Sequence, residues 1–140
     1  MEKQAFGVVG LGVMGANLAH NMERNGFSVA AFDRSAEKTA EFIAKSAGKK
    51  IKGARSLADM ASMLEKPRRI LLMVPAGAPV DAVLAEIKGN LEDGDIVIDG
   101  GNSLYYDTER RAKALEAEGT GIRFFGMGVS GGEEGALWGP

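Results

Sequence analysis

The chain has 140 residues, 45% of them hydrophobic and 26% charged, which is typical of one globular domain of ordinary size. Its 17 basic and 19 acidic residues leave a net charge of −2, so no basic excess favours a nucleic-acid partner. The absence of cysteine excludes disulfides, cysteine-ligated metals and a thiol nucleophile, and it is compatible with a cytoplasmic protein.

The amino-terminal segment imitates a signal peptide, because Lys3 precedes an apolar run over residues 5–15. Four glycines within that run make it a poor helix, and a buried strand followed by a glycine turn explains it better. No apolar run approaches the ~20 residues that a membrane-spanning helix needs, so we expect no membrane partner.

Short apolar runs alternate with segments of helical periodicity along the whole chain. We expect strands at 6–9, 29–32, 70–74, 96–98 and 123–125. We expect helices at 13–25, 36–46, 56–65, 80–88 and 108–118. The strand runs are apolar on consecutive residues, which suits a parallel sheet covered on both faces. The alternation therefore predicts βαβ units in an α/β fold, a doubly wound, mostly parallel sheet forming a single domain over 1–140.

Polar and glycine residues mark the ends of these helices. Ser35 and Ser56 stand where side-chain N-caps belong. Gly26, Gly48 and Gly119 stand where a left-handed C-cap is expected. These positions support the predicted boundaries.

Residues 10–15 read Gly-Leu-Gly-Val-Met-Gly, between a predicted strand and a predicted helix. The second strand then ends at Asp33, eighteen residues after Gly15. This is the arrangement of a Rossmann-type dinucleotide-binding domain, in which Gly10 permits the tight turn, Gly12 admits the pyrophosphate and Gly15 packs closely. Free backbone N–H groups and the helix dipole would attract the phosphates. The alternative is a plain glycine-rich turn between strand and helix.

The residues after the second strand bear on which dinucleotide is bound. The Asp33 carboxylate can accept a hydrogen bond from a ribose 2′-hydroxyl, which favours NAD, and it would repel a 2′-phosphate. Arg34 and Ser35 favour NADP instead, since a guanidinium and a hydroxyl can both donate to that phosphate. Asp33 could also merely help Ser35 to cap the next helix. We expect Asp33→Asn to raise the affinity for NADP relative to NAD.

The last segment, 126–140, contains six glycines yet also carries Val129, Leu137 and Trp138. Apolar side chains argue against a solvated linker, so we expect a loop whose backbone closely approaches a ligand, with no helix to close it. This loop and the segments 72–77 and 99–103 all follow the carboxyl ends of predicted strands, where ligands bind in open α/β sheets.

Two of these segments carry a closer resemblance. Asp-Gly-Gly-Asn at 99–102 and Val-Ser-Gly-Gly-Glu-Glu-Gly at 129–135, taken with the first glycine turn, closely resemble the amino-terminal domain of decarboxylating 6-phosphogluconate dehydrogenases. The similarity covers essentially the whole chain and lies within the β-hydroxyacid dehydrogenase superfamily. The related 3-hydroxyisobutyrate dehydrogenases share the first turn and the Val-Ser-Gly-Gly loop. They typically have an Asp-x-Ser-Thr type segment at 99–102 and lack the paired glutamates.

The resemblance implies an NADP- or NAD-dependent oxidoreductase that converts 6-phosphogluconate to ribulose 5-phosphate, in the pentose phosphate pathway and gluconate metabolism of the cytoplasm. It assigns cofactor contacts to Gly10, Leu11, Gly12, Val13, Met14, Gly15, Asp33, Arg34, Ser35, Val74, Pro75, Ala76 and Asn102. It assigns the sugar-acid phosphate substrate to Asn102, Ser130, Gly131 and Gly132, near the carboxylate of the substrate. The decarboxylation requires no metal.

The chain departs from the family pattern at two positions. Members that use NADP commonly have Asn-Arg-Ser/Thr after the second strand, where this chain has Asp33. Members also often have lysine where Pro75 stands, so one cationic contact near the cofactor is missing.

The family's general base, a lysine, and its proton donor, a glutamate, lie in a helical domain that follows and that also forms most of the homodimer interface. Neither motif occurs here, so we expect this chain to bind cofactor without catalysing turnover. The remaining polar candidates are interpreted as structural: His20 within a helix, Lys88 and Lys113 on solvated surfaces, Glu133 and Glu134 in the loop, and Tyr105 and Tyr106 packing at a helix start. The alternatives are a stand-alone NAD(P)-binding module with a sensory or scaffolding role, or a fragment of a 3-hydroxyisobutyrate dehydrogenase-like enzyme.

Overall fold

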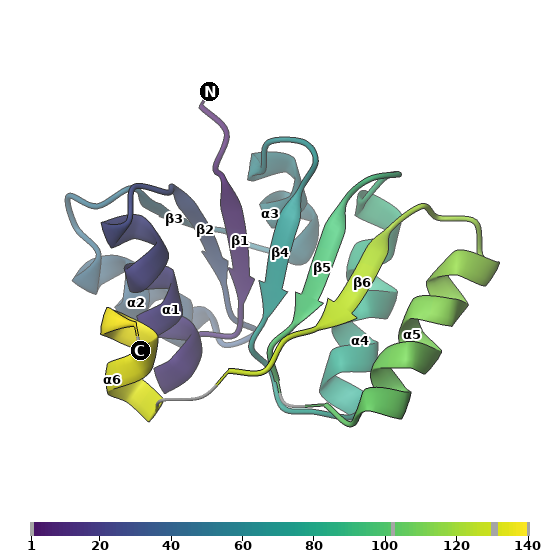
Figure 1. Ribbon diagram of the computed structural model, residues 1–140. Helices are drawn as coiled ribbons and strands as arrows, with labels where there is room; N and C mark the ends of the chain where they lie inside the picture. Colours follow the sequence, from purple (N-terminus) through teal and green to yellow (C-terminus); the bar gives the residue numbers. More distant parts are fainter. Residues whose placement is uncertain (1, 102, 130–131, 140) are drawn as a thin grey trace.

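The computed structural model describes residues 2–101, 103–129 and 132–139 and contains a six-stranded sheet with the strand order β3-β2-β1-β4-β5-β6 (Figure 1). The strands are β1 Phe6–Val9, β2 Val29–Phe32, β3 Ile51–Gly53, β4 Arg69–Leu72, β5 Ile96–Asp99 and β6 Arg123–Gly126. The helices are α1 Val13–Arg24, α2 Ala36–Lys45, α3 Leu57–Met63, α4 Ala78–Ile87, α5 Tyr105–Ala117 and α6 Gly132–Trp138, with a 3-10 turn, η1, at Lys88–Asn90. Every pairing among these strands is parallel, so the predicted doubly wound α/β fold is confirmed.

The chain winds outward from the middle of the sheet in both directions. It runs from β1 through β2 to β3 on one side, then returns to β4 beside β1 and continues through β5 to β6. The carboxyl ends of all strands meet at one edge, the lower edge in Figure 1. The reversal between β1 and β4 therefore creates the switch point where open α/β sheets bind ligands.

Two apolar clusters cover the two faces of the sheet, as consecutive apolar strand residues predict. On one face Val9 and Ile70 pack with residues of α3, α4 and α5. On the other face Val8 and Val29 pack with Ala19 of α1 and residues of α2. Helix α6 lies directly beside α1 on this second face (Figure 1).

The predicted caps are confirmed. The Ser35 and Ser56 hydroxyls accept hydrogen bonds from the amides of Lys38 and Asp59, at 3.2 and 3.0 Å. The glycines at positions 26, 48 and 119 all have positive φ, at 97°, 80° and 70°. Local sequence signals thus define where most helices begin and end. No helix in the described part of the chain has the length and apolar character needed to cross a bilayer.

Among the strands and α-helices of the described residues, β3 and α6 were not predicted. Strand β3 has three residues, and only Ile51 is buried, so it lacks the apolar run that marks the other strands. Helix α6 occupies part of the segment that we expected to be a loop without a helix, and that expectation was wrong. Two of its seven residues are glycine, which disfavours an isolated helix.

Two helices begin earlier than predicted. Helix α4 begins at Ala78, because Pro79 is compatible with the first turn of a helix. Helix α5 begins at Tyr105, where no apolar periodicity announces it. The expected packing of Tyr105 and Tyr106 is wrong, since the two residues are 75% and 55% exposed and their rings contact each other edge to face.

Candidate functional site

A cavity of about 660 Å³ opens at the carboxyl ends of the strands, around the switch point between β1 and β4. Its volume is in the range that holds cofactors and other small ligands. The structure brings nine of the predicted cofactor residues together in its lining: Gly10, Gly12, Val13, Met14, Gly15, Asp33, Arg34, Val74 and Pro75. The sequence therefore locates this cavity from three separate segments, the glycine turn and the loops after β2 and β4.

The other predicted residues have different placements. The Leu11 side chain is buried in the core cluster beneath α1, and Ser35 caps α2. Ala76 is exposed outside the lining, and Gly132 is the first residue of α6. The predicted residues Asn102, Ser130 and Gly131 lie outside the described part of the chain.

The sequence analysis did not name eight further lining residues individually, although four of them lie in segments that it placed at the ligand-binding edge. The eight residues are Val9, Lys38, Met73, Pro79, Val83, Gly100, Gly101 and Val129. Pro79 and Val83 stand four residues apart on α4, a spacing that places both on one helix face and that could have identified them. Lys38 stands in the first turn of α2, one turn after its capping residue, and adds a second cation beside Arg34.

The three fingerprint glycines have three different environments. Gly10 has φ of 100°, and a side chain there would meet the backbone oxygen of Met73. A side chain on Gly15 would meet the carbonyl oxygen of Gly10. A side chain on Gly12 would meet no protein atom within 4 Å, so the surface there is open toward the cavity. Gly10 and Gly15 are thus required by the protein itself, whereas the space at Gly12 is available to a ligand.

The amino terminus of α1 is equipped to hold an anion. Its N-cap is Gly12, which provides no side-chain acceptor, and its first turn contains no acidic residue. Helices α2 and α3, by contrast, are capped by serine hydroxyls. The first-turn amides of α1 and its helix dipole therefore face the cavity with no side-chain cap, which is the geometry that binds phosphate.

The Asp33 carboxylate is engaged within the protein. Its Oδ2 accepts a hydrogen bond from the Leu11 amide at 2.8 Å, and its Oδ1 accepts one from the Ser35 amide at 2.9 Å. Asp33 thus ties the glycine turn to the loop between β2 and α2. Of the roles considered from the sequence, the structural one is realised, and the ribose contact would have to use the remaining lone pairs.

A buried guanidinium supports the loop after β5. The Arg111 side chain is 2% exposed, and its Nε donates to Asp81 Oδ1 at 2.8 Å. Its other nitrogens donate to Ser103 Oγ and the Gly77 carbonyl, both at 3.2 Å. Arg111 also lies 3.6 Å from the fully buried Asp99 carboxylate. It therefore links the turn before α4 to the β5 loop, and sequence periodicity alone did not reveal it.

These contacts shift the pKa of both members of the closest pair. The hydrogen bond from Arg111 lowers the pKa of Asp81, and the hydrogen bond to Asp81 raises the pKa of Arg111. Both groups are therefore charged across the physiological pH range.

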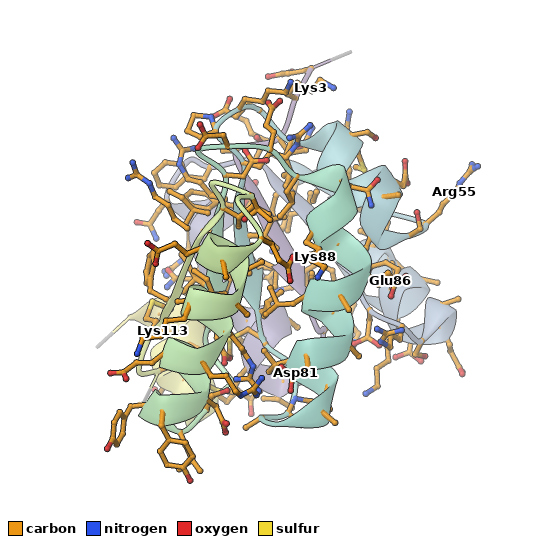
Figure 2. All side chains as sticks on the ribbon, turned by 90° about the vertical axis from the view of Figure 1, so that its right-hand side faces the viewer. Lys3, Arg55, Asp81, Glu86, Lys88 and Lys113 are labelled. Atoms are coloured by element: carbon orange, nitrogen blue, oxygen red, sulfur yellow. The ribbon has the colours of Figure 1, made fainter. Side chains whose placement is uncertain are left out.

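The remaining titratable candidates stand apart from the cavity. The His20 ring stacks on Phe42, and its Nε2 lies 3.1 Å from the Ser46 hydroxyl. Burial, followed by the nearby charge of Lys49, lowers the pKa of His20. Lys88 pairs with Glu118, the C-cap residue of α5, at 3.0 Å, so it has a structural partner. Figure 2 shows Lys113 on α5, on the side of that helix away from α4.

Other polar candidates are also outside the lining. Glu133 and Glu134 are exposed in the first turn of α6. Within residues 2–101, 103–129 and 132–139, no three acidic or histidine side chains gather in a way that could hold a metal ion.

Comparison with known proteins agrees with this geometry. Residues 5–140 match the family model described as the NAD binding domain of 6-phosphogluconate dehydrogenase. The decarboxylating 6-phosphogluconate dehydrogenase of Synechocystis sp. is 61% identical over the whole chain, which covers 29% of that protein. The NADP(+)-dependent decarboxylating enzyme of Bacillus subtilis is 54% identical, again over the whole chain and 29% of its own length.

Among solved structures, a 6-phosphogluconate dehydrogenase is also more similar to this chain than a 3-hydroxyisobutyrate dehydrogenase is. The 6-phosphogluconate dehydrogenase of Plasmodium falciparum, studied in its apo form, with its cofactor NADP+ and with its substrate 6-phosphogluconate, superposes with a TM-score of 0.86 at 38% identity. That match covers 95% of this chain and 28% of the other. The 3-hydroxyisobutyrate dehydrogenase of Mycobacterium tuberculosis is more distant, with a TM-score of 0.79 at 25% identity over 96% of this chain and 43% of the other.

The chain spans less than a third of the length of these curated relatives. The family match itself covers nearly every residue and includes every described residue that lines the cavity. The chain therefore belongs to the family of NAD binding domains of 6-phosphogluconate dehydrogenase.

Proposed function

We propose that this chain binds NADP at the cavity beside the glycine turn and is the cofactor-binding part of an enzyme that oxidatively decarboxylates 6-phosphogluconate. The observation that carries the proposal is the amino terminus of α1. Its first-turn amides have no side-chain cap and open, at Gly12, onto a cavity of about 660 Å³. Phosphate groups are the ligands that such a terminus binds best.

The residues around the cavity fit the parts of a dinucleotide. The α1 terminus would hold the pyrophosphate, and Arg34 and Lys38 would face the adenosine end with two positive charges. Apolar Met14 and Val74 would enclose the nicotinamide end and exclude water from it. When bound, the nicotinamide would supply an acceptor for the hydride that leaves the carbon bearing the substrate hydroxyl, while the hydroxyl proton would go to a base outside this chain.

The substrate would lie beside the loops after β5 and β6. Gly101 lines the larger cavity, while Ser103 and Gly128 line a neighbouring cavity of about 330 Å³. The residues on either side of position 102 thus face two adjacent spaces, which supports the assignment of Asn102 to both ligands. We propose that Ser130, Gly131 and Gly132 hold the carboxylate of the sugar acid through neutral donors, which do not oppose its loss as carbon dioxide.

Proton transfer is assigned to residues outside this chain. The curated relatives are more than three times as long. We assign the lysine base and the glutamate acid that the resemblance implies to a helical part outside this chain, which would also form the homodimer. We propose a cytoplasmic location, because phosphorylated sugars and NADP are intracellular metabolites. A stand-alone NAD(P)-binding module is the second reading, and a coding sequence that ends at Pro140 would favour it.

The test is a calorimetric titration of the chain with NADP and NAD, alone and with 6-phosphogluconate. We expect NADP to bind, and we expect no reduction of NADP at 340 nm when 6-phosphogluconate is present. Gly12→Ala should weaken cofactor binding at least about tenfold, because the methyl group occupies the space open to the phosphates. The same change should cost at most about 1 kcal/mol of stability, since a methyl group there meets no protein atom. Absence of binding by the unmodified chain would refute the proposal.

A further inference from the structure

At the end of the cavity formed by the loop after β2 and the start of α2, more positive than negative charge is available to a ligand. The charged lining residues among those described are Asp33, Arg34 and Lys38. Both oxygens of Asp33 already accept backbone hydrogen bonds within the protein. The two cations therefore decide how this end responds to a phosphate.

Arg34 is engaged by an acidic residue from another element. Its Nη2 lies 3.2 Å from Glu86 Oε2, across 52 residues of sequence. Glu86 stands on α4, three residues after Val83, which lines the cavity. Figure 2 shows Glu86 on the side of α4 that faces away from α5, opposite Lys88. The ion pair thus joins the loop after β2 to α4 at the adenosine end of the cavity.

We propose that Glu86 is a specificity-determining residue, a counterion that a 2′-phosphate must displace from Arg34 before NADP can bind. This inference rests on the proposed function, because it concerns the same cavity. NAD has a hydroxyl at the 2′ position and does not need the Arg34 charge. Glu86 therefore lowers the affinity for NADP more than the affinity for NAD.

The pair is weak enough to be exchanged. Its side chains are 58% and 52% exposed, so water competes for both charges. A phosphate carries up to two negative charges and accepts two parallel hydrogen bonds from one guanidinium, so it wins that competition. The displaced Glu86 carboxylate then remains near the phosphate and repels it. Both effects act against NADP and are absent for NAD.

Glu86→Gln tests the inference, because it removes the charge and keeps the side-chain size. We expect the variant to bind NADP about three- to tenfold more tightly, a change equivalent to ~0.6–1.4 kcal/mol, and to bind NAD within about twofold of the parent. Glu118→Gln is the matched control, since it breaks an ion pair of similar exposure, Lys88–Glu118, outside the cavity lining. The control should leave both affinities unchanged.

A second pair of variants tests whether Glu86 acts through Arg34. In an Arg34→Ala background, Glu86→Gln should raise the affinity for NADP by less than half as much, in free energy, as it does in the parent chain. The reason is that no guanidinium is left to release. A full gain in that background would overturn the inference, as would an unchanged NADP-to-NAD ratio or weaker NADP binding in Glu86→Gln alone. Failure of the parent chain to bind either cofactor would be a different result, since it refutes the proposed function itself.

Discussion

Replacing Arg111 by methionine should strongly destabilise the fold, because it removes the positive charge from a nearly closed site. The guanidinium contacts Asp81, Asp99, Ser103 and the Gly77 carbonyl. Removing one partner of a buried ion pair costs about 3–5 kcal/mol, since the other charge stays buried and uncompensated.

The two carboxylates do not contribute equally to this loss. The Asp81 side chain is 44% exposed and can be hydrated again, so its share is within about 1 kcal/mol. The Asp99 side chain is fully buried and retains hydrogen bonds from the Gly101 amide and the Ser103 hydroxyl. Most of the loss therefore comes from Asp99, and we expect Arg111→Met to cost about 3 kcal/mol. A domain of this size has about 5–15 kcal/mol of stability, so the variant should still fold.

Urea denaturation followed by far-ultraviolet circular dichroism measures the loss. The matched control is Arg110→Met, at the neighbouring position. The Arg110 side chain is 56% exposed and pairs with Asp81 and Asp107 at 3.4 and 3.6 Å. That control should cost less than about 1 kcal/mol. Adding Asp99→Asn to Arg111→Met should cost at least about 1 kcal/mol less than the sum of the two single changes. Equal losses for the two arginines, or additive losses at Arg111 and Asp99, would refute the reasoning.

The same variant has a pH signature. Arg111 lowers the pKa of Asp81 in the folded state, so the stability from this pair is fully present above the ordinary carboxyl pKa of about 4. It is lost as the pH falls through the lower folded pKa. Arg111→Met should therefore flatten the fall in stability below about pH 4. An unchanged acid limb would show that the hydrogen bond does not govern Asp81.

Three other changes test separate features. Gly15→Ala should cost about 1–3 kcal/mol in urea denaturation, because its methyl group would meet the Gly10 carbonyl; a cost under ~0.5 kcal/mol would contradict that packing. Asp33→Asn should weaken binding of both cofactors in calorimetry, since an amide has only one acceptor atom for the Leu11 and Ser35 amides. It should also raise the affinity for NADP relative to NAD, because the negative charge is removed. Stronger binding of both cofactors would exclude the role of Asp33 in the turn. Burial lowers the pKa of His20, so neutral His20 stabilises the fold above about pH 6.5 and this stability is lost as the pH falls through the lowered folded value. His20→Gln should flatten the fall in stability below about pH 6.5, and an unchanged slope would remove His20 from the pH dependence.

Most of the fold could be predicted because local signals and tertiary packing agree. Strands β1, β2 and β4 are apolar runs that are almost entirely buried, whereas β5 is partly buried and only Phe124 is buried in the edge strand β6. Helices separate the strands along the chain. Helix α6 could not be predicted, because its stability comes from α1. Ala136 is 2% exposed, the Leu137 carbonyl accepts from Arg24 at 2.7 Å, and the Arg24 guanidinium stacks on Trp138. Partners more than 100 residues away leave no periodic mark in the segment itself.

In the candidate site, too, the features set by the local backbone could be predicted, whereas the partners of the charged residues could not. Glycine positions report on backbone geometry, and the environments of Gly10, Gly12 and Gly15 agree with the roles that their spacing predicts. A charged residue reports only that a charge exists, because its partners come from other elements. Asp33 suggested a ribose contact, yet its carboxylate faces two amides of its own chain. Its negative charge is therefore partly compensated before any cofactor binds, which is how an aspartate at this position is compatible with NADP. The acidic group that Arg34 must leave is Glu86, 52 residues away. Cofactor preference in this chain thus depends on which acid holds Arg34 as well as on Asp33, the residue that follows β2.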